Sequence, residues 1–176
     1  MATKTRFNVR TITILAFLVA LGIILKRVLG IDTQFMRIDG AFIANTAIGA
    51  LFGPIPSATA FGISDILGFM LKPTGPYFPG FTLSAVITGL LYSFFYYRKE
   101  FTLKRIIMAN ITITLLDTLF LTPIWLTIMY QVPFWSLMPI RFLKVLIAIP
   151  IQVIVVYFVI PRVMQTSFFK QSKINI

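Results

Sequence analysis

Long apolar stretches separated by short polar connectors dominate this sequence of 176 residues. Apolar runs of roughly 15 to 25 residues are typical of helices that cross the hydrocarbon core of a bilayer. The pattern predicts six transmembrane helices, at residues 11–25, 38–52, 57–71, 81–97, 106–130 and 137–160. We therefore expect an all-α integral membrane protein that forms one six-helix domain over residues 1–176.

Prolines and glycines mark the connections between the apolar runs. Proline lacks a backbone N–H and disfavours helical geometry in the residue before it. Residues 53–56, with the sequence Gly-Pro-Ile-Pro, are expected to form a tight turn, and residues 72–80, with three prolines and two glycines, the least regular connection. Within the runs, Pro123, Pro139 and Pro150 predict kinks.

The composition agrees with a lipid environment. The chain is 58% hydrophobic and only 12% charged, with a mean hydropathy of +0.92. A water-soluble domain of this size has too little polar surface to cover so many apolar residues. It has no cysteine and no histidine, which excludes disulfides, thiolate metal sites and the commonest general base. The net charge of +11 comes from short segments between apolar runs, a distribution that favours membrane topology over nucleic-acid binding.

The distribution of basic residues predicts the orientation, because cytoplasmic connectors carry an excess of lysine and arginine. The first run has no small-residue cleavage site and is expected to be retained as a span. A cytoplasmic amino terminus then places ten basic residues inside and six outside, which predicts that both termini are cytoplasmic. The inner ten are Lys4, Arg6, Arg10, Arg98, Lys99, Lys104, Arg105, Arg162, Lys170 and Lys173, and the outer six are Lys26, Arg27, Arg37, Lys72, Arg141 and Lys144.

Four of the outer basic residues are candidates for an anion-binding pocket. Arg141 and Lys144 are three residues apart and project from nearly the same face of the last helix. Together with Arg27 and Arg37 they would bind a carboxylate or phosphate, which arginine holds with two parallel hydrogen bonds. The alternative is that these side chains extend to lipid headgroups.

Two carboxylates, Asp65 and Asp117, interrupt apolar runs. An unpaired carboxylate in hydrocarbon is costly, so each is expected to pair with a basic residue or to face a polar cavity. One interpretation is a salt bridge or hydrogen bond that ties helices together. The other is that an aspartate accepts paired hydrogen bonds from an amino-substituted nitrogen heterocycle.

Residues 75–82 combine rigid prolines with aromatic rings at a membrane boundary. The rings could stack on a planar ligand or anchor the chain at the bilayer interface. The candidate ligand contacts in this segment are Gly75, Tyr77, Phe78, Phe81 and Thr82.

Ala16 and Ala20 lie four residues apart on one face of the first predicted helix. Small residues at this spacing allow a second helix to approach closely, although the pattern is frequent in membrane helices.

Several of these segments resemble the folate-type substrate-binding (S) components of energy-coupling factor (ECF) vitamin importers. The resemblance covers nearly the whole chain, and Ala16 and Ala20 match the pattern by which such components dock their coupling subunit. The other matching segments are Arg37-Ile38, Leu51-Phe52-Gly53-Pro54, Gly75-Pro76-Tyr77-Phe78-Pro79-Gly80-Phe81-Thr82-Leu83-Ser84-Ala85 and Pro139-Ile140-Arg141-Phe142-Leu143-Lys144.

The resemblance implies the six-helix S-component fold and a high-affinity, outward-facing folate pocket closed by the loop before the fourth span. It implies no cofactor, and as partners a transmembrane coupling subunit and two ATPases in the cell membrane. The chain has no phosphate-binding loop of its own, so ATP hydrolysis is expected on those partners and the chain is not expected to be an enzyme.

Roles for the candidate residues follow from the chemistry of folate, which joins a flat pterin, an aromatic spacer and a dianionic glutamate. The basic residues Arg27, Arg37, Arg141 and Lys144 would hold the glutamate, the aromatic segment would contact the rings, and Asp65 or Asp117 would bind the pterin edge.

Three alternatives remain at this point. The ligand could be another vitamin or a precursor. The chain could be a membrane-embedded enzyme acting on lipid or prenyl phosphates, with Asp65 and Asp117 holding a metal, although two separated aspartates make a poor magnesium site. Finally, it could be a structural or assembly subunit that binds no ligand.

Overall fold

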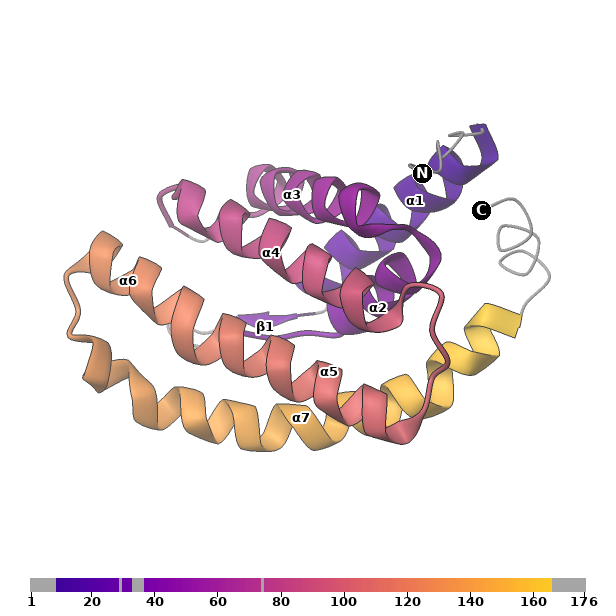
Figure 1. Ribbon diagram of the computed structural model, residues 1–176. Helices are drawn as coiled ribbons and strands as arrows, with labels where there is room; N and C mark the ends of the chain where they lie inside the picture. Colours follow the sequence, from indigo (N-terminus) through magenta and orange to yellow (C-terminus); the bar gives the residue numbers. More distant parts are fainter. Residues whose placement is uncertain (1–8, 29, 33–36, 74, 166–176) are drawn as a thin grey trace.

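The computed structural model describes residues 9–28, 30–32, 37–73 and 75–165. In this part of the chain, α-helices make up almost all of the regular structure (Figure 1). The elements in chain order are α1 (Val9–Ile23), η1 (Ile24–Val28, π-helical), β1 (Ile31–Asp32), β2 (Arg37–Ile38), α2 (Ala41–Leu51), α3 (Pro54–Leu71), α4 (Pro79–Tyr96), α5 (Leu103–Leu115), η2 (Leu116–Leu121, π-helical), α6 (Thr122–Tyr130) and α7 (Phe134–Gln165).

Five helical segments are long and apolar enough to cross a membrane within the described residues. They are Thr11–Val28, Pro54–Leu71, Pro79–Tyr96, Leu103–Tyr130 and Phe134–Val163. The prediction of a helical, multi-pass membrane protein is confirmed in this form. The remaining apolar helix, α2, has 11 residues and is about 16 Å long, roughly half the thickness of the hydrocarbon core.

The second predicted span begins later than the sequence indicated. Arg37 and Ile38 do not start a helix but pair with β1 in a short antiparallel hairpin. The helix starts at Ala41, whose backbone N–H donates to Asp39 Oδ1 over 3.0 Å. The predicted start at residue 38 is therefore wrong, because the Asp39 carboxylate fixes the first turn of the helix two residues further on.

Two prolines that were expected to interrupt the chain instead begin helices. Pro54 and Pro79 occupy the first positions of α3 and α4. A helix does not use the backbone N–H at its first position, so proline fits there without losing a hydrogen bond. The predicted turn at residues 53–56 therefore extends only to Gly53, and α7 contains Pro139 and Pro150 within one continuous helix whose axis curves (Figure 1).

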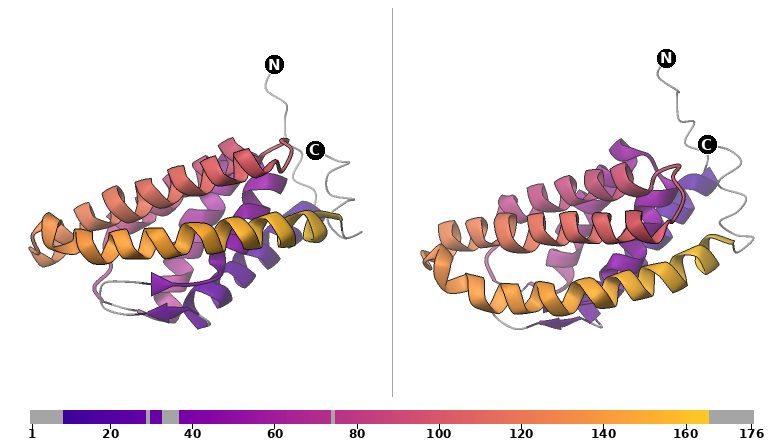
Figure 2. Two further views of the ribbon diagram at one scale, coloured as in Figure 1. Left: turned by 90° about the horizontal axis from the view of Figure 1, so that it is seen from below. Right: turned by 60° about the horizontal axis from the view of Figure 1, so that its bottom comes forward.

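The helices form two pairs around a short central helix. Helices α3 and α4 lie side by side, and α7 runs antiparallel beside the α5–α6 rod (Figure 2). Helix α2 contacts α1, α4 and α7, and eight of its eleven residues are buried. Gly49 makes this packing possible, because a Cβ there would lie 2.7 Å from the backbone of Tyr92.

The apolar core and two of the connections, α3–α4 and α6–α7, lie toward different ends of the molecule. The buried cluster uses the first half of α1, the second half of α4 and the last part of α7, for example Ile14, Tyr96 and Ile160. The start of α1 and the end of α7 lie at this same end (Figures 1 and 2). The α3–α4 and α6–α7 connections lie at the opposite end, which leaves that end of the bundle open to form a site.

Candidate functional site

A cavity of about 1240 Å³ lies among the helices, bordered by the apolar core at Phe61, Tyr92 and Ile113. This volume exceeds the 300 to 1,000 Å³ typical of small-molecule sites, so an extended ligand would fit. Nine of the predicted site residues line it: Arg27, Asp65, Gly75, Tyr77, Phe78, Phe81, Asp117, Arg141 and Lys144. These nine residues come from η1, α3, α4, η2, α7 and the loop before α4, segments that are far apart in the sequence.

Two further residues that the sequence predicted as ligand contacts, Thr82 and Arg37, are not among these nine. Thr82 is outside the cavity lining but contacts two residues that belong to it, Asp65 and Tyr77. The side chain of Arg37 lies outside the described residues, and only its backbone is placed, in β2.

The two buried arginines turn into the molecule instead of extending to the lipid surface. Arg27 and Arg141 are 5% and 4% exposed. Arg27 Nη1 donates to the carbonyl of Lys72 over 3.0 Å, and Arg141 Nη1 donates to the carbonyl of Thr118 over 3.1 Å. Gly68 makes room for the first of them, because a Cβ at this position would lie 3.2 Å from Arg27 Nε. Both positive charges are thereby held beside the cavity.

Both π-helical segments supply charged or polar residues to the cavity. Segment η1 contributes Lys26 and Arg27, and η2 contributes Asp117 and Thr118. A π-turn replaces the i→i+4 bond by an i→i+5 bond and is often found at functional sites. In η2, the Thr118 carbonyl accepts the hydrogen bond from Arg141, so the irregular turn fixes a cation of the neighbouring helix.

The two partly buried aspartates have different surroundings. Asp65 Oδ1 is 3.3 Å from Lys26 Nζ, and Asp65 Oδ2 accepts a hydrogen bond from Thr82 Oγ1 over 3.1 Å. In the part of the chain that the structure describes, Asp117 forms no ion pair or hydrogen bond through its carboxylate. It faces the cavity within electrostatic range of Lys26, Arg141 and Lys144. Asp117 is thus the carboxylate that is placed to accept hydrogen bonds from a ligand.

Aromatic rings form one wall of the cavity mouth. Phe78 lies 6.2 Å from Phe81 and 5.7 Å from Trp125, measured between ring centroids. Trp125 is itself fixed, because its Nε1 donates to Ser84 Oγ over 2.7 Å. The Tyr77 ring packs 5.3 Å from Phe69. These contacts hold the rings before any ligand is bound.

Sequence reasoning missed several polar residues of this site. Lys26 was counted among the outer charges but not among the site residues, although a carboxylate within a span requires such a partner. Isolated polar residues in otherwise apolar runs were the available signal for the others. Those that line the cavity are Asn45, Ser64, Ser84, Thr88, Thr114 and Gln152, of which Thr114 donates to Gln152 over 3.1 Å.

Ala16 and Ala20 lie outside the cavity. Both are exposed on the outer surface of α1, beside Phe17, which is also exposed. This face of α1 is therefore available to lipid or to another helix.

A metal-dependent active site finds no support in this geometry. Among residues 9–28, 30–32, 37–73 and 75–165, no group of three or more acidic, histidine or cysteine side chains could hold a metal ion. Asp65 is committed to Lys26 and Thr82, which leaves it poorly placed to share a metal with Asp117.

Comparisons with known proteins agree in fold and in sequence. A family model described as "ECF transporter, substrate-specific component" matches residues 10–160. The folate transporter FolT of Clostridium novyi is 38% identical over 150 residues, covering 85% of this chain and 87% of that protein. FolT of Leuconostoc mesenteroides is 32% identical over 161 residues, covering 88% and 86%. A crystal structure of FolT bound with folic acid superposes with a TM-score of 0.80 at 36% identity, covering 86% of this chain and 92% of that one.

Proposed function

Since the chain belongs to the family of substrate-specific components of ECF transporters, we propose that it captures folate for import across the cell membrane. The sequence resemblance is confirmed at the level of the family. The observation that carries the choice of ligand is the cavity itself, where buried guanidinium groups, an uncommitted carboxylate and preformed aromatic rings meet. A transporter component that binds its substrate in this way needs no chemical step of its own.

The glutamate end of folate is assigned to the basic residues of the cavity. Arg27, Arg141 and Lys144 line it, and Arg37 joins them in this proposal from its place in β2. Arginine and lysine donate charge-assisted hydrogen bonds to carboxylates. Folate carries two carboxylates on its glutamate, which is why a dianionic ligand suits this cavity better than a neutral or cationic vitamin.

The pterin end is assigned to Asp117. A carboxylate accepts two parallel N–H bonds from an amino-substituted heterocycle, provided that its oxygens are not already engaged. Asp65 was an equal candidate from the sequence, but its two oxygens bind Lys26 and Thr82. The rings of Tyr77, Phe78 and Phe81 then lie along the wall that the planar parts of the ligand would contact.

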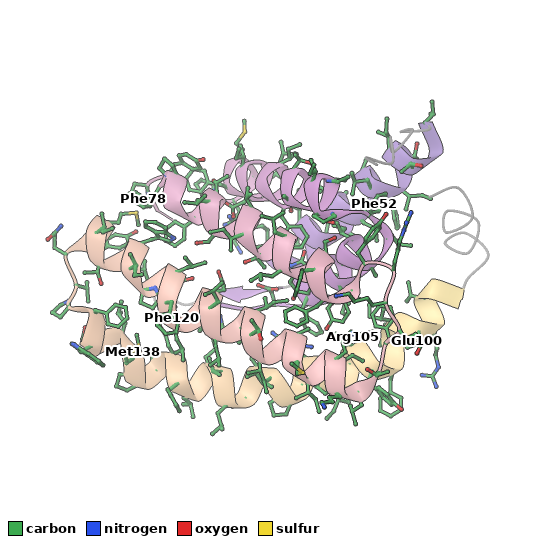
Figure 3. All side chains as sticks on the ribbon, viewed as in Figure 1. Phe52, Phe78, Glu100, Arg105, Phe120 and Met138 are labelled. Atoms are coloured by element: carbon green, nitrogen blue, oxygen red, sulfur yellow. The ribbon has the colours of Figure 1, made fainter. Side chains whose placement is uncertain are left out.

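We place six helices of one domain in the membrane, with both termini in the cytoplasm. In this arrangement α2 is the sixth membrane segment and is shielded from lipid by α1, α4 and α7. Figure 3 supports the orientation: Phe78 and Met138 lie at one end of the molecule, and Glu100 and Arg105 at the other. The basic α4–α5 connection thereby faces the cytoplasm with the start of α1, and the cavity opens to the outside.

The proposed partners are a transmembrane coupling subunit and two ATPases, which would hydrolyse the ATP. The exposed face of α1 at Ala16 and Ala20 is the candidate docking surface, since small side chains allow a second helix to pack closely in lipid.

The test is a binding measurement on the purified protein. Mass spectrometry of the protein purified from a folate-containing culture should detect folate, and titration should give a submicromolar Kd for folate but not for riboflavin, thiamine or biotin. Micromolar or weaker binding of folate, or tighter binding of another vitamin, would overturn the assignment.

A further inference from the structure

Asp65 is at the centre of a chain of polar contacts that connects three helical segments to the loop before α4. We infer that Asp65 and Thr82 are positioning residues, which hold Tyr77 and its loop over the cavity and thereby slow the release of the ligand. The inference rests on the proposed function for its ligand, but the contacts themselves belong to the protein without ligand.

The chain of contacts runs through four side chains. Lys26 Nζ in η1 lies 3.3 Å from Asp65 Oδ1 in α3. The other carboxylate oxygen accepts from Thr82 Oγ1 in α4 over 3.1 Å, and Thr82 Oγ1 lies 2.9 Å from the Tyr77 hydroxyl. The Asp65 side chain is only 12% exposed, so water screens the two interactions of its carboxylate only weakly. A carboxylate whose two oxygens are both used by the protein is placed to organise the site more than to read a ligand.

The loop is fixed near both of its ends by hydrogen bonds to residues of the helical bundle. At its beginning, Arg27 Nη1 donates to the Lys72 carbonyl, and Lys72 Nζ donates in return to the Arg27 carbonyl over 3.2 Å. At its end, Thr82 holds the Tyr77 hydroxyl. Between them Gly75 has a φ of +149°, a conformation that side chains rarely adopt, so the chain reverses there. Releasing the second attachment would free Tyr77 while leaving the first in place.

Loss of this attachment should raise the dissociation rate of the ligand more than it changes the association rate. Removing one neutral hydrogen bond corresponds to roughly a fivefold change in a rate or equilibrium constant. Tyr77→Phe, which keeps the ring and its packing against Phe69, should therefore release folate roughly fivefold faster than the parent protein. Asp65→Asn should have an effect at least as large, because it also removes the negative charge beside Lys26.

The first experiment measures folate dissociation by a chase with unlabelled folate. If the contacts act as one unit, Tyr77→Phe combined with Thr82→Val releases folate no faster than the more affected single variant. Matched controls are Tyr157→Phe, on the exposed face of α7, and Thr59→Val, whose hydroxyl bonds only within its own helix; both should keep the parent rate. Multiplying effects of Tyr77→Phe and Asp65→Asn would instead indicate that Asp65 contacts the ligand directly, and would overturn the inference.

The second experiment needs no ligand. Because the chain has no cysteine, a single spin label can be introduced at Pro76→Cys, beside Tyr77 in the loop, or at Lys99→Cys at the opposite end. Asp65→Asn should increase the mobility of the label at position 76 and leave that at position 99 unchanged. Unchanged mobility at both positions would refute the positioning role. A protein that does not bind folate would refute the proposed function, and this measurement would still decide the role of Asp65.

Discussion

Arg141 offers the sharpest test of how the cavity holds a ligand. Its side chain is 4% exposed, lines the cavity and is oriented by the hydrogen bond from Nη1 to the Thr118 carbonyl. Arg141→Ala removes a buried, oriented cation. A hydrogen bond to a charged group contributes about 1.5 to 3 kcal/mol. Loss of about 3 kcal/mol of binding free energy corresponds to a Kd for folate that is roughly 150-fold higher.

The assay compares two ligands that differ in one part. Folate diamide has neutral amides in place of the two glutamate carboxylates of folate, so it lacks the charges that Arg141 is proposed to bind. Isothermal titration should show a large loss of folate affinity in Arg141→Ala but nearly equal affinity for folate diamide in the parent and variant proteins. Arg162→Ala is the matched control, because Arg162 lies on the same helix, is exposed, donates to the Phe158 carbonyl and does not line the cavity.

Equal losses for folate and folate diamide would refute this reasoning, since the effect of Arg141 would then not pass through the glutamate carboxylates. Thermal unfolding of the ligand-free proteins separates binding from folding. The bond to Thr118 ties α7 to η2, so a modest drop in Tm is expected for Arg141→Ala, and the affinity difference between the two ligands remains the deciding quantity.

Three further predictions concern other parts of the molecule. Asp117→Asn should weaken the binding of folate and of pteroate, which is folate without its glutamate, each by roughly 10- to 100-fold in titrations, because it removes a charged acceptor from the pterin end. A loss of affinity confined to folate would contradict this. Ala16→Leu should leave the Kd for folate unchanged and abolish folate uptake by cells that contain the coupling proteins, and normal uptake would exclude this docking surface. In chemical denaturation, Gly49→Ala should lower the free energy of unfolding by about 1 to 3 kcal/mol, because the new Cβ would lie 2.7 Å from the α4 backbone. Gly53→Ala is the control and should change this free energy little, because the atom nearest to its Cβ would lie 3.7 Å away.

The spans that stand alone as apolar runs could be predicted well from the sequence. The predicted runs at residues 57–71, 81–97 and 106–130 correspond to α3, α4 and the α5–α6 rod within three residues at each end. The second span was misplaced because its apolar run continues through Ile38 into the hairpin. Hydropathy does not distinguish an apolar strand residue from the start of a helix, and only the pairing with Ile31 decides it.

The candidate site could be predicted by residue type but not by pairing. The cost of placing charge in lipid was enough to select Arg27, Arg141, Asp65 and Asp117 for attention. It could not reveal that Lys26 is the partner of Asp65, because the two are 39 positions apart and several cations were available.

The structural role of Trp125 could not be predicted from its residue type. An aromatic residue in an apolar run is unremarkable in a membrane protein, yet here its indole nitrogen binds Ser84 and its ring contacts Phe78. Such a role depends on the direction in which the helix presents the side chain, and the π-helical segment η2, which comes just before α6, shifts that direction from the one that a regular helical period predicts.

The π-helical segments η1 and η2 also make the cavity wall sensitive to the insertion or deletion of single residues. A π-turn behaves as a single extra residue within a helical rod, so everything after it is rotated by about 100° relative to an uninterrupted α-helix. Deleting one residue from Leu116–Leu121 would rotate α6 about its axis and turn Trp125 away from Ser84 without altering any side chain. Insertions and deletions, as well as substitutions, are thus a route by which chains of this architecture can acquire or lose a particular ligand.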